Sequence, residues 1–366
     1  MGSSEMEPRH GLAMRLPSRL SPGAKVALTA PSAGTAAVFP HVRDRAIEVL
    51  RTNFQFTLVI GESLYRVETP PRRRAEELNA FFADPEVEGI ICAIGGDDLL
   101  RVEPFLDKET IRRNPKVVLG YSDITNLHLM LFSLGIISYY GGNLLCQFGL
   151  LGGMQSITQS SFVAATQGKD PFLLLESPTY VNDYPNWSAD SDKTLLSLPA
   201  PLWDWQGRLD RPVRGILWGG CLECMLVLFA AGSTLVEPDE SHGRLVVFFE
   251  TSEVMPPDFF VYGFVQALGK RGLLDRIAAL LVGRPKTECL GQQAVGGKEA
   301  YAQNQKSAVL RGLKEHFADK ESAETELPFP VVFDMDFGHT DPQNFLPLGS
   351  VAEVDPVSKS IRICQT

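Results

Sequence analysis

The sequence predicts a two-domain α/β protein whose first domain is built on a doubly wound parallel sheet. Three observations support this fold class. The chain has 366 residues, which is more than one hydrophobic core usually holds. Short apolar runs alternate with helical patterns along most of it, and one long irregular stretch divides the alternation into two blocks. We therefore expect four parts: a disordered tail at 1–22, an N-terminal domain at 23–178, a connecting loop at 179–212 and a C-terminal domain at 213–366.

The elements of the first block follow the tail, in which Gly, Ser, Pro and charged residues occur without a period. Apolar runs bounded by turn residues predict buried strands at 26–30, 56–60, 89–94, 117–119 and 136–139. Helical patterns lie between them at 42–51, 72–82, 99–105 and 124–132. Because strand and helix alternate, we expect the strands to pair in parallel.

The second block follows the connecting loop, which carries Trp187, Trp203 and Trp205. Indole rings in a long loop either bind a ligand or pack the two domains together, and both interpretations stay open. Beyond the loop we expect strands at 245–249, 277–282 and 331–333, and a closing pair around a turn at 355–358. Helices are expected at 222–231, 259–268 and 306–317. The closing pair gives this domain more antiparallel character than the first.

The overall composition narrows the class of partner. A formal net charge of -10 and a pI near 5.2 oppose binding to nucleic acid, because affinity for phosphates comes from Lys and Arg. No apolar run approaches the length that crosses a bilayer, and none follows a basic flank as in a signal peptide. The six cysteines are scattered through apolar segments, which is typical of reduced thiols. We therefore expect a cytoplasmic protein that acts on a small molecule, without nucleic-acid or membrane partners.

The sharpest local feature is the run that leads to Ser122. An apolar strand ends in Gly120-Tyr121-Ser122 and passes at once into a helix, as in a nucleophile elbow. Such a turn exposes the serine hydroxyl, and the free N–H groups of the helix start favour a developing oxyanion. The second glycine of Gly-x-Ser-x-Gly is replaced by Ile124. The alternative is that Ser122 and Asp123 form an ordinary helix cap.

A nucleophilic serine needs a general base, and the chain has six histidines. His339 is the candidate, because it follows the strand at 331–333 and its neighbour Gly338 permits a tight loop at the strand end. His128 shares the helix of Ser122 but is nearly two turns along it, so we expect it to pack or to face solvent. The alternative for His339 is a structural histidine that bonds nearby Asp side chains.

The third candidate is Glu250, which closes the apolar strand at 245–249. A carboxylate at the end of a buried strand needs a partner, and a histidine whose tautomer it fixes would supply one. Glu253, three residues on, is expected to be more exposed. A salt bridge or a place at a helix N-terminus is the alternative for Glu250.

Backbone donors are expected from the glycines of 93–98, at the end of the third strand. This run matches neither the dinucleotide-binding pattern nor a P-loop. Cys221 and Cys224 form a lone C-x-x-C without a second pair at zinc spacing, so we interpret them as core packing. No His-Glu-x-x-His or calcium-loop pattern occurs. The sequence therefore predicts neither a metal nor an organic cofactor.

Together these motifs resemble the LD-carboxypeptidase family of serine peptidases, in its branch related to the microcin C immunity peptidase. The resemblance spans most of the chain and is carried by Ile94-Gly95-Gly96-Asp97, Asn114-Pro115-Lys116, Gly120-Tyr121-Ser122-Asp123-Ile124-Thr125-Asn126-Leu127-His128, Gly219-Gly220-Cys221-Leu222-Glu223, Phe249-Glu250-Thr251-Ser252-Glu253 and Phe337-Gly338-His339-Thr340-Asp341-Pro342. It implies a Rossmann-like N-terminal domain, a smaller swivelling β/α C-terminal domain, an active site between them and a homodimer without cofactors.

The resemblance also implies residue roles and a substrate class. Ser122 would be the nucleophile and Glu250 and His339 its triad partners. The oxyanion hole would come from backbone N–H groups of Gly96 or Asp97 and of Asp123. Members of the family cut an amide next to a terminal amino acid, either the L,D bond of a cell-wall tetrapeptide or the bond between an aminoacyl group and a nucleotide mimic.

This chain departs from the branch in its substrate loop, where Trp187 is followed by Ser-Ala-Asp-Ser-Asp rather than by an acidic pair. Trp187 and Trp205 are the candidate substrate-binding residues of that loop. We expect a serine hydrolase that works through an acyl-enzyme on a small peptide or aminoacyl conjugate. Two alternatives remain: a biosynthetic acyltransferase on the same triad, and a non-catalytic ligand-binding relative.

Overall fold

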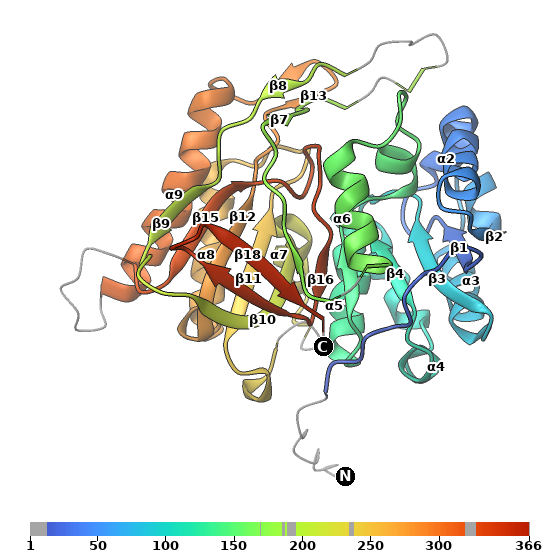
Figure 1. The fold of residues 1–366 in the computed structure, drawn as a ribbon, viewed down its shortest axis with the longest axis horizontal. Helices are drawn as coiled ribbons and strands as arrows, with labels where there is room; N and C mark the ends of the chain where they lie inside the picture. Colours follow the sequence, from blue (N-terminus) through green and yellow to red (C-terminus); the bar gives the residue numbers. More distant parts are fainter. Residues whose placement is uncertain are drawn as a thin grey trace.

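The computed structural model describes residues 13–168, 170–184, 187–188, 195–233, 238–318 and 327–365. Within them the chain folds into two sheets that stand side by side, each with helices packed around it (Figure 1). The strand order is β16-β5-β4-β3-β1-β2 in the first sheet and β6-β18-β17-β10-β11-β12-β15-β9 in the second. The expected α/β class with parallel strands is confirmed.

The first sheet holds five parallel strands: β1 (Lys25–Thr29), β2 (Thr57–Ile60), β3 (Val87–Cys92), β4 (Val117–Gly120) and β5 (Ser138–Tyr140). Its helices are α1 (Thr35–Val38), α2 (Pro40–Thr52), α3 (Pro71–Ala83), α4 (Lys108–Arg113), α5 (Thr125–Ser133) and α6 (Ser156–Thr166). Side chains of β1 alternate between two apolar clusters, with Val26 and Leu28 in one and Ala27 in the other. Both faces of this sheet are therefore buried, as is usual for parallel strands.

The second sheet mixes parallel and antiparallel pairs. Its parallel centre is β10 (Val213–Cys221), β11 (Leu245–Glu250), β12 (Ile277–Gly283) and β15 (Pro330–Met335). Antiparallel strands flank this centre: β6 (Phe172–Leu173), β9 (Asp204–Gly207), β17 (Val351–Asp355) and β18 (Ser360–Cys364). The helices are α7 (Leu222–Ala230), α8 (Asp258–Lys270) and α9 (Lys298–Ala318). The closing hairpin was expected from the turn at 355–358.

Short elements complete the described fold. Two ribbons are formed by β7 (Thr179–Tyr180) with β8 (Leu198–Pro199) and by β13 (Glu288–Cys289) with β14 (Gln292–Gln293). Single 3-10 turns occur at Glu62–Tyr65, Leu99–Arg101, Glu103–Phe105, Ser122–Ile124, Glu240–His242 and Leu274–Arg276, and a π-helical turn at Leu144–Phe148.

Three expectations differ from the structure. The helix expected at 99–105 is two 3-10 turns, because Pro104 lacks the N–H that a continuous helix would use. Helix α9 begins at Lys298 rather than at 306, since its polar first turns have no apolar period but consist mainly of good helix formers. In the predicted tail, residues 1–12 lie outside the described residues. Residues 13–22 pack on the fold, where Leu20 is buried and Arg15 N bonds Gly135 O.

The two sheets are joined by the segment that follows the candidate base. Strand β16 (Leu346–Leu348) pairs antiparallel with β5 of the first sheet. The next residues bond to the second sheet, because Gly349 N donates to Leu217 O and Leu217 N donates to Ser350 O. Residues 336–345, which include His339, are therefore held between the sheets, near the carboxyl ends of β4 and β11.

A buried ion pair holds the start of this segment. Arg284 donates to Asp336 Oδ1 at 2.8 Å and to the carbonyl of Asp334 at 3.0 Å. The other oxygen, Asp336 Oδ2, accepts from Trp203 Nε1 at 2.8 Å and from the amide of Ser177 at 3.0 Å. Asp336 is fully buried. Trp203 thus packs within the protein, which is one of the two interpretations left open for the loop tryptophans.

We predict that Asp336→Ala lowers the free energy of unfolding by about 3 to 5 kcal/mol, because it leaves the Arg284 cation buried without its carboxylate. Urea unfolding measures the change. Glu76→Ala is the matched control, since its ion pair with Arg73 is exposed and is worth under about 1 kcal/mol. Equal effects of the two substitutions would contradict the assignment of Asp336 as a structural anchor.

Candidate active site

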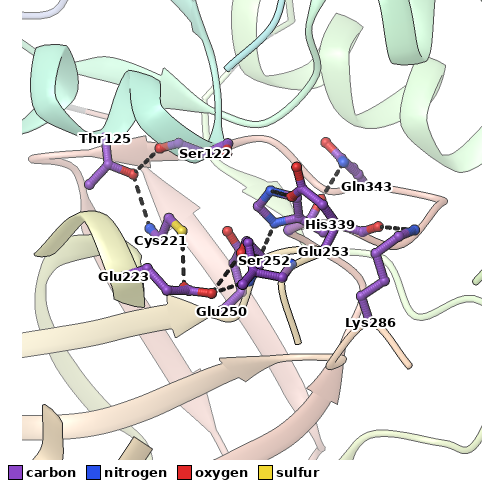
Figure 2. Close-up of polar contacts among 12 residues, drawn as sticks. Ser122, Thr125, Cys221, Glu223, Glu250, Ser252, Glu253, Lys286, His339 and Gln343 are labelled. Atoms are coloured by element: carbon purple, nitrogen blue, oxygen red, sulfur yellow. Dashed lines mark hydrogen bonds and ion pairs between the residues drawn. The ribbon is translucent and has the colours of Figure 1, made fainter. Parts of the chain in front are cut away.

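Ser122 lies in a sharp turn between β4 and α5. Its φ of 64° is in the left-handed region, which non-glycine residues seldom adopt. Gly120 makes the turn possible, because a Cβ there would lie 2.9 Å from the Ile124 side chain. Thr125 Oγ1 donates to Ser122 O at 2.6 Å and accepts from the amide of Cys221, so it also ties the turn to the second sheet (Figure 2). Neither the 3-10 turn Ser122–Ile124 nor α5, which follows it, has a side-chain cap at its start. The structure thus differs from the alternative in which Ser122 and Asp123 form a helix cap.

His128 supports this turn from behind. It is buried, with Nε2 2.8 Å from Gly120 O and Nδ1 2.8 Å from Ser138 Oγ. Burial lowers its pKa to about 4, partly offset by the contact with Gly120. The imidazole is therefore neutral at physiological pH and donates through Nε2. The sequence predicted that His128 packs or faces solvent, and did not predict that it holds the strand that carries Ser122.

The glycine-rich loop after β3 is held against Ser122 by the side chain of Asp123. Its Oδ2 accepts from Ser32 Oγ and from the amides of Asp98 and Leu99 at 3.0 and 2.9 Å. A Cβ on Gly95 would lie 2.8 Å from Ser122 Oγ, so only glycine fits there. Gly95 and Gly96 line the pocket of Ser122, whereas Asp97 is exposed and is not among the described lining residues.

Glu250 and His339 meet between the sheets. Glu250 is the last residue of β11 and is fully buried, and its Oε2 lies 2.6 Å from His339 Nδ1 (Figure 2). Gly338 allows this approach, because a Cβ at that position would lie 2.5 Å from Glu250 Cγ. Lys286 Nζ donates to the carbonyl of His339 at 3.0 Å and to that of Asn182 at 2.6 Å. The loop of His339 is therefore fixed on both sides.

Tyr140 connects Glu250 to Ser122, a link that the sequence did not predict. Its hydroxyl donates to Glu250 Oε1 at 2.5 Å and accepts from the amide of Ser122 at 3.2 Å. Burial, together with the charge of Glu250, raises the pKa of Tyr140 well above its ordinary value, so the phenol stays neutral and donates. The only sequence signal was its place at the end of a strand, before two glycines.

The second ring nitrogen of His339 faces Glu253. Its Nε2 lies 3.1 Å from Glu253 Oε2, close enough for an ion pair although the atoms are not aligned as a hydrogen bond. The side chain of Glu253 is 41% exposed and that of Glu250 is 0% exposed. Glu253 is therefore the more exposed of the two, as the sequence predicted. Among the described residues no hydrogen bond joins Ser122 Oγ to His339. In this state His339 lies between two carboxylates.

The two carboxylates change the charge of the histidine. Burial alone would lower the pKa of His339, but the charge of Glu250 and the contacts with both carboxylates outweigh it and raise the pKa to about 10. Burial would likewise raise the pKa of Glu253, but the contact with His339 outweighs it and lowers the pKa to about 2. His339 is thus an imidazolium at neutral pH in the free protein.

These groups open into one pocket of about 490 Å³. It is lined by Ala33, Thr35, Phe39, Ile94, Gly95, Gly96, Tyr121, Ser122, Asn143, Cys146, Tyr184, Trp187, Glu253, Cys289, Leu290 and His339. Trp187 packs edge-on against Phe39, with ring centroids 5.4 Å apart. Trp205 is in β9, paired with Val332, and is not among the described lining residues. Of the two tryptophans proposed to bind substrate, only Trp187 therefore reaches the pocket.

The described residues include no group of three or more His, Cys, Asp or Glu arranged to hold a metal ion. All six cysteines are free thiols, and Cys221 contacts Glu223 rather than a metal ligand set, at 3.3 Å. No helix in the described ranges is long and apolar enough to cross a membrane.

Comparison with proteins of known sequence identifies relatives over almost the whole chain. The microcin C7 self-immunity protein MccF of Escherichia coli is 27% identical over 334 residues, covering 88% of this chain and 87% of the relative. A protein of Vibrio cholerae named "Putative carboxypeptidase" is 28% identical over 345 residues, covering 92% and 93%.

Solved structures share the fold. MccF in complex with glutamyl sulfamoyl guanosine superposes with a TM-score of 0.80 at 23% identity, covering 96% of this chain and 98% of that chain. An MccF-like protein from Streptococcus pneumoniae in complex with AMP has a TM-score of 0.77 at 25% identity, covering 94% and 99%. At 23% identity, the likeness to the MccF structure shows the shared two-domain fold alone.

Two family models match the chain in succession. The LD-carboxypeptidase N-terminal domain matches residues 26–141, which hold β1 to β5, and the LD-carboxypeptidase C-terminal domain matches residues 214–354, which hold most of the second sheet. Because the two matches cover well over half of the sequence and follow its two sheets, this chain belongs to the LD-carboxypeptidase family of peptidases.

Proposed function

We propose that this chain is a serine hydrolase that cleaves a peptide-like amide next to a terminal residue. In this proposal Ser122 is the nucleophile, His339 the general base and Glu250 the carboxylate that orients the imidazole. The observation that carries it is the contact of 2.6 Å between Glu250 Oε2 and His339 Nδ1. This contact leaves the other ring nitrogen, Nε2, for the pocket that Ser122 also lines.

The proposed reaction is acyl transfer to water. Neutral His339 takes the proton of Ser122 Oγ through Nε2, and the serine oxygen forms a bond to the amide carbonyl carbon. The C–N bond breaks, and His339 returns the proton to the leaving nitrogen. A water molecule then cleaves the acyl-enzyme by the same proton route. Glu250 stabilises the imidazolium that forms in each half of the reaction.

The oxyanion of the tetrahedral intermediate needs backbone donors. The amide of Ser122 is already bonded to Tyr140, so the amides of Asp123 and Gly96 are the proposed donors. Asp123 stands in the first turn after β4, where free N–H groups favour an anion. Gly96 lines the pocket and Asp97 does not, which favours Gly96 among the two sequence candidates.

The substrate we propose is an aminoacyl conjugate or a small peptide. A pocket of about 490 Å³ is of the size that binds small organic ligands. Solved MccF structures hold glutamyl sulfamoyl guanosine and aspartyl sulfamoyl adenosine, which are aminoacyl groups joined to nucleosides. The half-buried ring of Trp187 is suited to stacking on a flat group of such a ligand.

We further propose a reducing, cytoplasmic compartment, because the cysteines are free thiols, and a homodimer, as the family resemblance implies.

The nucleophile is tested with a fluorophosphonate. We expect one covalent adduct on the wild-type protein and none on Ser122→Ala, as read by intact-protein mass. The variant should keep its fold, since Ser122 lines a pocket and its hydroxyl is not part of the core. A folded wild-type protein that forms no adduct would contradict the hydrolase and favour the ligand-binding alternative.

The pH dependence follows from the charge of His339. Its pKa is raised to about 10, so the neutral base is scarce at pH 7, and each pH unit below the pKa reduces it about tenfold. We predict that the rate of fluorophosphonate labelling rises from pH 7 towards pH 10. A plateau reached by pH 7.5 would contradict this.

The same shift predicts the pH dependence of stability. The pKa of His339 is higher in the folded protein than the ordinary 6.5. Its contribution to stability is therefore complete below pH 6.5 and is lost as the pH rises through about 10. Urea unfolding at pH 6.5 and pH 10 should show a lower midpoint at pH 10 in the wild type. A smaller loss is expected in His339→Gln, and an equal loss in both proteins would contradict the assignment.

Tyr140→Phe tests the support of Glu250. The substitution leaves the buried Glu250 Oε1 without its donor, which should lower the free energy of unfolding by about 1 to 3 kcal/mol and slow fluorophosphonate labelling. Tyr139→Phe is the matched control, because it removes a buried hydroxyl from the adjacent residue without touching Glu250. If the two variants label at the same rate, Tyr140 does not position the site.

A further inference from the structure

The pocket of Ser122 has an unusual balance of charge. Among its described lining residues only Glu253 and His339 carry charged side chains, and neither Lys nor Arg is present. Lys286 lies behind the pocket, where its Nζ is buried, bonded to the carbonyls of Asn182 and His339 and 3.8 Å from the centroid of the Tyr184 ring. A substrate carboxylate therefore finds no free cation among the described lining residues, whereas a substrate cation finds Glu253.

Glu253 is presented to the pocket by a fixed turn. The turn after β11 is anchored by Glu223, whose Oε1 accepts from the amide of Ser252 at 2.9 Å and from Ser252 Oγ at 2.7 Å (Figure 2). Ser252 Oγ in turn accepts from the amide of Val254 at 3.2 Å. Glu253 stands between these residues with 41% of its side chain exposed. Its Oε2 has no aligned hydrogen-bond donor within the described part of the chain, although it is shielded from solvent.

We propose that Glu253 binds a positively charged group of the substrate, the free α-ammonium of an aminoacyl group, and that this binding releases His339 to serve Ser122. The proposal rests on the hydrolase function proposed above and specifies its substrate. It assigns to Glu253 the selection of a free amine, and to the substrate a part in activating the base.

Geometry selects the α-ammonium. The nitrogen that must accept the Ser122 proton, His339 Nε2, is the one 3.1 Å from Glu253 Oε2. During attack the carbonyl carbon lies about 3 to 3.5 Å from the serine oxygen. When Ser122 Oγ comes within hydrogen-bond reach of this nitrogen for proton transfer, about 2.6 to 3.2 Å, Glu253 lies within a few bond lengths of the reacting carbonyl, where an amino group on the adjacent carbon falls. An N-acylated residue has no positive charge at this place, so its capture by Glu253 is lost.

The release of His339 follows from the groups that face it. Its ring contacts Glu250 on one side and Glu253 on the other, the Tyr121 ring packs edge-on against it with centroids 5.0 Å apart, and the buried Lys286 donates to its backbone carbonyl. In the free protein both glutamates stabilise the imidazolium. An ammonium on Glu253 removes one of these partners and adds a repelling cation, so the imidazolium loses its Nε2 proton to solvent and Nε2 becomes free to accept the proton of Ser122.

The first test compares two substrates, alanyl sulfamoyl adenosine and its N-acetyl derivative. We expect wild-type protein to prefer the free amine in kcat/KM by at least about tenfold. Glu253→Gln should lose about 10- to 100-fold in kcat/KM on the free amine, the range of one charge-assisted hydrogen bond. It should hydrolyse the N-acetyl compound about tenfold faster than wild type, because Glu253 no longer holds His339 as a cation, so that the preference for the free amine disappears. A wild-type preference for the N-acetyl compound, or a preference for the free amine that survives in Glu253→Gln, would overturn the proposal.

The second test uses a probe without an ammonium group. If Glu253 holds His339 as a cation, Glu253→Gln should react with a fluorophosphonate at pH 7.5 about tenfold faster than wild type, because a fall of one unit in the pKa of His339 raises the neutral fraction tenfold. A purely structural role would not speed this reaction. An unchanged or slower rate in a folded variant would overturn the proposal.

Glu288→Gln is the matched control for both tests. It removes one carboxylate next to the lining residue Cys289, but Glu288 pairs with Lys298 and does not contact His339. We expect wild-type substrate preference and labelling rate in this variant. Failure of the proposed hydrolase function can be told apart from failure of the role of Glu253. If the hydrolase function fails, Ser122 stays unlabelled in wild type and in both variants.

Discussion

The buried contact between Glu250 and His339 is the interaction on which the rest of the site depends. A carboxylate at the end of an apolar strand is unfavourable without a partner, and here the partner comes from a segment held between two sheets. Two further hydrogen bonds satisfy the remaining acceptors of this pair. Tyr140 donates to the second carboxylate oxygen of Glu250, and Lys286 donates to the carbonyl of His339. The Arg284–Asp336 pair holds the segment where it leaves β15. In the proposed mechanism, a change in any of these alters the direction of the imidazole and, through it, the reactivity of Ser122.

The site also contains a conflict between stability and catalysis. Two glutamates on one imidazole stabilise the folded protein, but they keep the histidine protonated, and a protonated histidine cannot accept the serine proton. Glu250 is buried and fully engaged, while Glu253 is half exposed and opens into the pocket. The second contact is therefore the one that a ligand can replace. In the mechanism we propose, this arrangement makes the base available where a substrate cation is present and keeps it unreactive elsewhere.

Much of the fold, and the positions of Ser122, Glu250 and His339 at the ends of strands, could be predicted from the sequence, because both depend on local patterns. Apolar runs bounded by turns predicted the parallel strands. Ser122, Glu250 and His339 stood out because each lies at or shortly after the end of such a run, with a glycine close before Ser122 and His339. Features set by contacts between distant segments were missed. Tyr140 lies 110 residues from the carboxylate it supports, and nothing near it in the chain indicates that contact. Trp205 resembled Trp187 in the sequence, but it lies in β9 and pairs with Val332 of β15. This strand pairing decides where its side chain lies.

The most direct test of the central claim is to find the acyl group during turnover. Alanyl sulfamoyl adenosine is mixed with the protein, the reaction is quenched in acid within its first turnovers, and the digested protein is mapped by mass spectrometry. The account predicts that the mass of an alanyl group appears on the peptide that contains Ser122 and is absent from Ser122→Ala. Turnover by wild type with no acyl group on that peptide, or undiminished turnover by Ser122→Ala, would contradict it.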